Sequence, residues 1–139
     1  MLPLLAGNLS APKPTASGRK RIIVAEDDTA IATLLTRVLS QHYDVKHAAT
    51  GALVLQYAVE PPVPSLFMLD VMMPDLDGFA VATKLRAVQQ LKQVPIIFLT
   101  ARTAPTDIIR GIQTGARHYI QKPFKIDDVL SKVKKTIGE

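Results

Sequence analysis

Short apolar segments alternate with amphipathic segments along the chain from residue 21 onward. Each amphipathic segment carries apolar residues every three or four positions, a spacing that predicts a helix. The short segments between them have the length and the apolar or alternating pattern of strands in a buried sheet. The predicted strands cover residues 21–25, 43–48, 66–69, 95–100 and 118–121.

The helical segments carry recognisable start and stop residues. Asp28 or Thr29 is suited to cap the first helix, and Thr50 and Asp77 precede the second and third. In the second helix we expect Ala52, Leu55 and Val59 to face the core. Apolar positions of the other four helices are Ile31, Leu34, Leu35, Val38 and Leu39; Phe79, Ala82, Leu85 and Val88; Ile108, Ile109 and Ile112; and Ile126, Val129, Leu130, Val133 and Ile137.

Five strand–helix units in strict alternation predict a single α/β domain over residues 21–139. Such alternation is typical of a doubly wound parallel sheet with right-handed crossovers, here a flavodoxin-like (βα)5 fold with strand order 2-1-3-4-5. Residues 1–20 are rich in proline and small residues. They show neither the two-residue period of a strand nor the 3.6-residue period of a helix, so we expect them to form a flexible leader.

Composition narrows the function classes without selecting one. The 139 residues are 47% hydrophobic and 21% charged, and they contain no cysteine, which excludes disulfides and thiolate metal sites. The net charge is +5, but four of the 17 basic residues lie in or beside the leader, and the rest of the chain is nearly neutral. This balance argues against nucleic-acid binding by the domain. With no long apolar run and no good signal peptide, a cytoplasmic protein without membrane contact is expected.

Polar residues gather where the predicted strands end. Glu26 and Asp27 follow the first strand, Asp70 the third, Thr100 the fourth and Lys122 the fifth. Ligands of open α/β sheets bind at the carboxyl ends of the strands, where the strand order reverses. Three carboxylates there would repel one another and raise each other's pKa unless a cation lies among them. Oxygen ligands with room for water favour Mg²⁺.

Together these groups suit phosphoryl transfer. Mg²⁺, the ammonium group of Lys122 and the hydroxyl group of Thr100 would hold a phosphoryl group while Asp70 attacks it and becomes an aspartyl phosphate. Taken singly, Asp70 could equally be a loop cap, and Glu26 and Asp27 could be helix caps, although Asp28 is available for the capping role.

The chain resembles a response-regulator receiver domain of two-component signalling over residues 21–137. The motifs that carry the resemblance are Glu26-Asp27, Asp70-Val71-Met72-Met73-Pro74 with Gly78, Thr100-Ala101 and Lys122-Pro123-Phe124. The sequence Thr100-Ala101-Arg102 is most similar to receivers attached to winged-helix DNA-binding domains. The sequence leaves open whether this is a stand-alone receiver or part of a longer protein.

The resemblance implies a role for each motif residue. Asp70 would accept a phosphoryl group from a sensor histidine kinase or a phosphotransfer protein, in a domain that catalyses only its own phosphorylation and dephosphorylation. Asp27, Asp70 and the backbone carbonyl of Met72 would bind Mg²⁺, with Glu26 acting largely through water. Thr100 and Lys122 would bind the phosphoryl oxygens, and Thr100 and Tyr119 would be the switch residues. The resemblance also implies that the Lys122–Pro123 peptide bond is cis.

Other phosphate-handling classes fit less well. A flavodoxin-like cofactor carrier needs a phosphate-binding loop where Glu26, Asp27 and Asp28 stand. A haloacid-dehalogenase-type phosphatase needs an acid at the position of Met72, and a P-loop NTPase needs a Gly-Lys-Ser/Thr motif. A degenerate receiver that acts only as a binding module is the non-catalytic alternative, although no motif acid, hydroxyl or lysine is lost here.

The resemblance also implies a signalling surface on the fourth helix, the fifth strand and the fifth helix. Winged-helix-linked receivers typically dimerise there through ion pairs, with acidic residues after a Gly-Ala pair. Here Gly115-Ala116 is followed by Arg117 and His118. We therefore expect no tight dimer through this surface, and either an acidic partner or an ordinary solvated surface.

Overall fold

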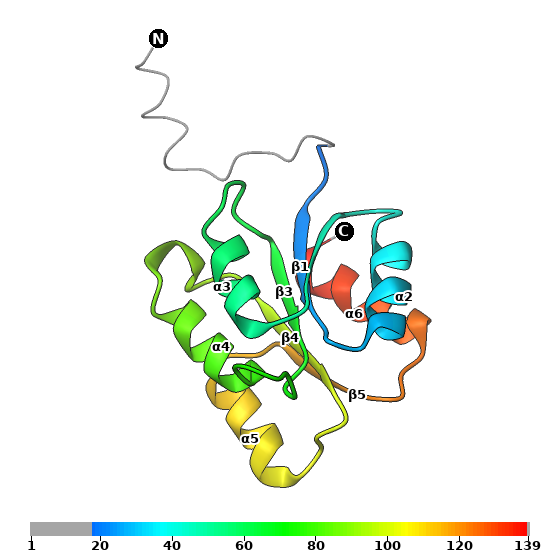
Figure 1. Ribbon diagram of the computed structural model, residues 1–139. Coiled ribbons are helices and arrows are strands. Elements are labelled where there is room, and N and C mark those ends of the chain that lie inside the picture. The colour runs from blue at the N-terminus through cyan, green and yellow to red at the C-terminus, as the bar shows by residue number, and fades with distance from the viewer. Residues whose placement is uncertain (1–17, 139) are drawn as a thin grey trace.

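The computed structural model describes residues 18–138 (Figure 1). Predicted leader residues 1–17 lie outside this range, and the boundary at residue 20 stays a prediction. None of the helices within it is long or apolar enough to cross a membrane. The elements in chain order are β1 (Arg21–Ala25), α2 (Thr29–Leu39), β2 (Asp44–Ala48), α3 (Gly51–Ala58), β3 (Leu66–Leu69), α4 (Gly78–Arg86), the 3-10 helix η1 (Gln89–Leu91), β4 (Ile96–Thr100), α5 (Pro105–Gln113), β5 (His118–Gln121) and α6 (Ile126–Ile137).

The five strands form one parallel sheet in the order β2-β1-β3-β4-β5, which confirms the predicted topology. The order reverses at β1, which pairs with both β2 and β3: Ile23 lies opposite Lys46 on one side and Phe67 on the other. Helices α3, α4 and α5 cover one face, and α2 and α6 cover the other (Figure 1). The carboxyl ends of β1 and β3 therefore meet at the reversal point, as doubly wound folds require.

Side chains of the central strands point alternately into two separate hydrophobic cores, one on each face of the sheet. Ile23 and Phe67 lie in the core beneath α3 and α4, whereas Ile22 and Met68 lie in the core beneath α2 and α6. All four are at most 1% exposed. Successive strand residues point to opposite faces, so both faces must be apolar when both carry helices. This is why β3 is apolar throughout and β1 is apolar from Ile22 to its end.

Three predicted helix starts are confirmed. Asp28 Oδ1 accepts a hydrogen bond from the Ile31 amide at 3.0 Å, and Asp77 Oδ1 accepts one from the Ala80 amide at 2.8 Å. Thr50 Oγ1 accepts the corresponding hydrogen bond, from Leu53, at 3.2 Å. Each side chain satisfies an amide that the first helical turn leaves unpaired.

The predicted inward face of α3 is wrong. Ala52 is exposed and Val59 is 64% exposed, while the buried residues of α3 are Gly51, Val54 and Ala58. Leu55 is partly buried against the core. The two sets have the same spacing, and α3 is apolar almost all round, so periodicity could not choose between them.

Candidate functional site

Three carboxylates meet at the reversal point of the sheet. Glu26 and Asp27 follow β1, and Asp70 follows β3, whose backbone is tied to β1 by a 3.0 Å hydrogen bond from the Asp70 amide to the Ala25 carbonyl. One carboxylate oxygen from each acid lies within 4.8 Å of the others. Asp27 is exposed, whereas Glu26 and Asp70 are buried.

Glu26 is the most enclosed of the three acids, with 1% of its surface exposed. Its Oε2 accepts a 3.1 Å hydrogen bond from the Asp28 amide. Its Oε1 lies 2.7 Å from Lys122 Nζ, yet no well-aligned hydrogen bond reaches that oxygen. Burial raises the pKa of the Glu26 carboxyl, against the opposing effects of Lys122 and the Asp28 amide, and the charge of Asp70 adds to the rise.

Lys122 joins two of the acids. Its Nζ donates to Asp70 Oδ2 at 2.7 Å and lies equally close to Glu26. Its backbone amide donates to the Thr100 carbonyl at 2.9 Å, which ties the end of β5 to the end of β4, and the Lys122–Pro123 bond is cis. Burial alone would lower the pKa of Lys122, but the two carboxylates outweigh burial and raise it. The lysine therefore remains positively charged.

The loop after β3 fixes the second oxygen of Asp70. Asp70 Oδ1 accepts a 3.1 Å hydrogen bond from the amide of Met72, a residue that is 56% exposed. The loop closes where the Gly78 amide donates to the Val71 carbonyl at 2.8 Å. A Cβ atom at Gly78 would lie 2.4 Å from the Asp70 carbonyl oxygen, so only glycine fits this approach.

Thr100 and Tyr119 meet at a different residue, Arg102. Thr100 ends β4, is fully buried, and accepts a 3.2 Å hydrogen bond from the Arg102 amide through Oγ1. The Tyr119 hydroxyl group donates to the Arg102 carbonyl, and its ring packs on Phe98 at a centroid distance of 5.9 Å. The Arg102 side chain forms a 2.7 Å ion pair with buried Asp107. Burial and the nearby Asp107 charge raise the pKa of Tyr119.

Sequence reasoning missed this connection. The sequence shows Arg102 only as part of the Thr100-Ala101-Arg102 motif. Its contacts with Thr100 and Tyr119 use its backbone amide and carbonyl, which every residue except proline possesses, so the residue type gives no signal. Asp107 had a weak signal, as an acidic residue in the first turn of an otherwise apolar helical pattern.

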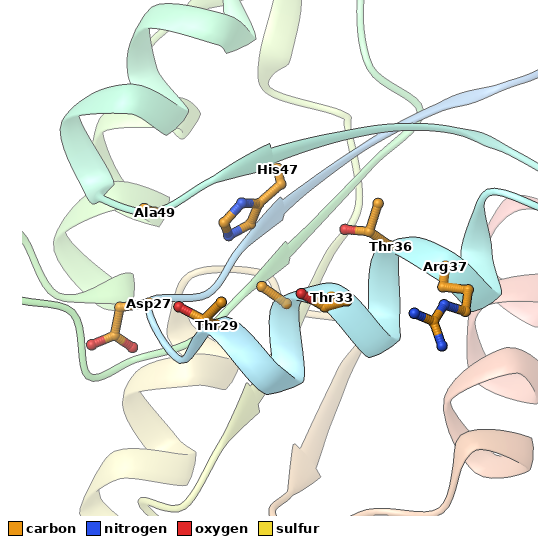
Figure 2. A pocket seen from close by; sticks show the side chains of 8 residues that line it. Asp27, Thr29, Thr33, Thr36, Arg37, His47 and Ala49 are labelled. Carbon is orange, nitrogen blue, oxygen red and sulfur yellow. The ribbon is translucent and has the colours of Figure 1, made fainter.

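A hollow of about 450 Å³ opens beside the carboxylates, between α2 and β2 (Figure 2). Asp27 lies at one end of this hollow, and His47 of β2 faces it with Nε2 2.7 Å from the Glu26 carbonyl oxygen. The α2 side of the hollow carries threonines at positions 29, 33 and 36. These residues have helical spacing in the sequence, but the apolar positions of the same helix were the only ones used to predict it. Of the three acids, Asp27 is the one that lines this hollow.

The donor set fits a hard divalent cation. Among the residues that the structure describes, Glu26, Asp27 and Asp70 each offer a carboxylate oxygen to the cluster. Glu26 Oε1 is buried without an aligned hydrogen bond, and Asp27 is open to solvent. Mg²⁺ prefers such ligands and retains several waters. Glu26, Asp27 and Asp70 are the residues that would hold it, while the part assigned to the Met72 carbonyl stays a prediction.

Comparison with known proteins places these features in a family. The family model described as response regulator receiver domain matches residues 22–134. The DNA-binding regulator RpaA of Synechocystis is 37% identical over 115 residues, covering 82% of this chain and 47% of RpaA. PhoP of Bacillus subtilis, an alkaline phosphatase synthesis regulator, is 41% identical over 116 residues, covering 83% of this chain and 47% of PhoP.

Among solved structures, chemotaxis protein CheY4 of Vibrio cholerae aligns with a TM-score of 0.80 at 27% identity, covering 85% of this chain and 98% of that one. The chain spans about half the length of the curated relatives that it matches. The similarity is thus to about half of each longer regulator and to nearly the whole of the CheY4 chain.

Proposed function

The chain belongs to the response-regulator receiver family, whose general function is phosphoacceptance in two-component signalling, and we propose that Asp70 is its phosphoacceptor. The observation that carries the proposal is the position of Lys122 Nζ, 2.7 Å from both Asp70 and Glu26 at the edge where three carboxylates gather. A lysine so placed offsets negative charge beside Asp70, whose other carboxylate oxygen is held by the Met72 amide.

In the proposed reaction, an Asp70 carboxylate oxygen attacks the phosphorus of a phosphohistidine on a histidine kinase or phosphotransfer protein. The new oxygen–phosphorus bond forms as the phosphorus–nitrogen bond breaks, and the released imidazole takes a proton from solvent. Attack by water then returns the carboxylate and inorganic phosphate. Bound Mg²⁺, held by Glu26, Asp27 and Asp70, would offset the negative charge of the phosphoryl oxygens.

The other residues act on the phosphoryl group once it is attached. Lys122 would exchange its contact with Asp70 for a contact with a phosphoryl oxygen. The hydroxyl group of Thr100 would turn away from the Arg102 amide and toward another phosphoryl oxygen. Because Tyr119 is hydrogen bonded to the same residue, a shift of Arg102 would reach β5 and the neighbouring α5 and α6. We describe this as a population shift between two packings.

The direct test is incubation with acetyl phosphate and Mg²⁺, read by intact mass. One added phosphoryl group is expected. An unmodified chain that nevertheless binds Mg²⁺ would contradict the proposal and identify the domain as a binding module. A cytoplasmic location beside a sensor kinase is part of the same proposal, as is the absence of direct nucleic-acid contact by this domain.

Mg²⁺ binding is expected to raise the melting temperature, since a ligand at about 100 times its Kd stabilises the folded state by about 2.7 kcal/mol. Asp27→Ala should remove more of this gain than Glu26→Ala, because Asp27 is open to solvent while both Glu26 oxygens already face Lys122 or an amide. Thermal melts of each variant at increasing Mg²⁺ concentrations measure the gain in melting temperature. Asp44→Ala, which removes an exposed carboxylate of β2, is the matched control; equal losses in the Asp27 and Glu26 variants would refute the distinction.

Thr100→Ala is expected to remain phosphorylated but to lose most of the accompanying amide shift changes in β4 and β5. The physical reason is that the hydroxyl group contacts the phosphoryl group only after Asp70 has accepted it. NMR spectra with and without phosphodonor measure both effects. Thr103→Ala, in the same loop, should keep the wild-type response, and an undiminished response in Thr100→Ala would reject the role.

A further inference from the structure

The first turn of α3 is capped by two different parts of the chain. Thr50, the residue before α3, accepts a hydrogen bond from the Leu53 amide. Asp75, in the loop between β3 and α4, accepts two more at 2.9 Å, one from the Gly51 amide through Oδ1 and one from the Ala52 amide through Oδ2. The first amides of a helix have no partner within the helix, so the cap of α3 is complete only with Asp75 in place.

These contacts fix the carboxylate of Asp75 although the residue is exposed. The amides of Ala52, Gly51 and Leu76 lower the pKa of the Asp75 carboxyl, and the positive end of the α3 dipole favours the same ionised form. Each carboxylate oxygen is bonded to a different amide, so the side chain cannot turn without losing a hydrogen bond. Asp75 therefore ties α3 to a loop that begins more than ten residues after the helix ends.

Backbone packing holds the same point of the loop. A Cβ atom at Gly51 would lie 2.8 Å from Leu76 Cβ and 3.0 Å from the Leu76 carbonyl oxygen, so α3 begins directly against the residue after Asp75. The Val81 side chain of α4 would be as close as Leu76 Cβ, and α3 and α4 lie side by side on this face of the sheet (Figure 1). The loop is thus held to α3 by both a side chain and its backbone.

The part of the loop that contacts Asp70 lies between two such fixed points, the closure at Gly78 and the contact of Asp75 with α3. Between them, the Met72 amide donates to Asp70 Oδ1 at 3.1 Å, while the Met72 side chain is 56% exposed. Met73 is partly buried against the core. Because Met72 itself packs so little, the direction of its backbone depends on how the two ends of the loop are held.

We propose that Asp75 is a positioning residue for phosphoacceptance, which keeps the Met72 amide directed at Asp70 by holding the loop to the first turn of α3. This role rests on the proposed function of Asp70 and adds to it a residue outside the cluster of three carboxylates. Asp75 acts through the backbone of Met72. The Met72 carbonyl, which the sequence predicts as a Mg²⁺ ligand, belongs to the same stretch of backbone and would be oriented by the same contact.

The test compares Asp75→Ala with Thr50→Ala, which removes the other cap of the same helix. Both variants should melt at a lower temperature because each leaves amides of α3 unpaired. NMR relaxation of the metal-free, isotopically labelled full chain separates them. In Asp75→Ala the order parameter of the Met72 amide should fall from about 0.85 to below about 0.6, whereas Thr50→Ala should keep the wild-type value. Asp75→Asn retains one acceptor oxygen and should lie between wild type and Asp75→Ala.

Mg²⁺ titration of the folded variants gives a second measurement. Asp75→Ala should bind Mg²⁺ about tenfold more weakly than wild type, and Thr50→Ala should bind it as wild type does. An unchanged Met72 amide or an unchanged Mg²⁺ affinity in Asp75→Ala would overturn the proposal, and so would equal changes in both alanine variants, since Asp75 would then only cap α3. A wild-type chain that takes up no phosphoryl group while both measurements turn out as expected would refute only the proposed function.

Discussion

Replacing Asp70 with asparagine is expected to abolish the gain of one phosphoryl group that the wild-type chain shows with acetyl phosphate and Mg²⁺. The amide is a poor nucleophile, and it also removes the negative charge that Lys122 Nζ contacts at 2.7 Å. Intact mass spectrometry measures the effect. No detectable product is expected under conditions that convert most of the wild-type chain.

The loss should not come from unfolding. Lys122 pairs with only two of the three carboxylates at this edge, and burial raises the pKa of Glu26, so the ionised form of Glu26 is disfavoured in the folded state. Its folded-state pKa therefore lies above the unfolded value of about 4.5, and the ionised cluster costs stability once the pH rises above that value. Without metal, Asp70→Asn should thus melt no lower than wild type at neutral pH.

Asp27→Asn serves as the matched control, since it removes a neighbouring carboxylate of the same length but leaves the nucleophile in place. It should slow phosphorylation without preventing it, because Mg²⁺ is held less well. A phosphorylated Asp70→Asn protein would show that another acid accepts the group and would reject the assignment.

Gly78→Ala is expected to destabilise the domain by about 3 kcal/mol, although alanine is the better helix former by about 1 kcal/mol. A Cβ atom at this position would lie 2.4 Å from the Asp70 carbonyl oxygen and 2.9 Å from the Val71 Cα. Both obstacles are backbone atoms of the loop that orients Asp70, so they cannot rotate away. Urea denaturation measures the change in the free energy of unfolding.

Gly111→Ala is the comparison, because its Cβ atom would meet the Tyr119 ring at 3.0 Å and a side-chain ring can move. We expect a change within about 1 kcal/mol there. If both variants lose a similarly small free energy of unfolding, the loop after β3 is free to move. In that case the close approach of Gly78 does not hold the loop around Asp70.

Local pattern in the sequence was sufficient for the fold. The continuous apolar segments of β1 and β3, and caps such as Asp28 and Asp77, are decided by residues within a few positions of one another. Strict alternation of strands and helices then leaves few topologies, because parallel strands need right-handed crossovers. The gathering of acids at one edge followed from the same rule, since parallel strands all end on one side.

The tertiary structure decided what depends on residues distant in the chain. Lys122 contacts an acid 52 positions away, and no spacing rule foretells that its Nζ lies equally close to Glu26. The link from Thr100 through Arg102 to Tyr119 runs largely through backbone groups that every residue possesses.

The face that each helix buries was likewise a tertiary outcome. In α3 two sets of apolar residues have the same spacing, and the close approach at Gly51, where a Cβ atom would lie 2.8 Å from Leu76, accompanies the set that is buried. In α5 the apolar pattern indicates a buried isoleucine stripe. Instead, α5 buries Asp107, which pairs with Arg102, and Gly111, which lies close to Tyr119, so the isoleucines lie on the outside. Periodicity identifies a helix from its own residues, whereas the face it buries depends on which neighbour can be approached most closely.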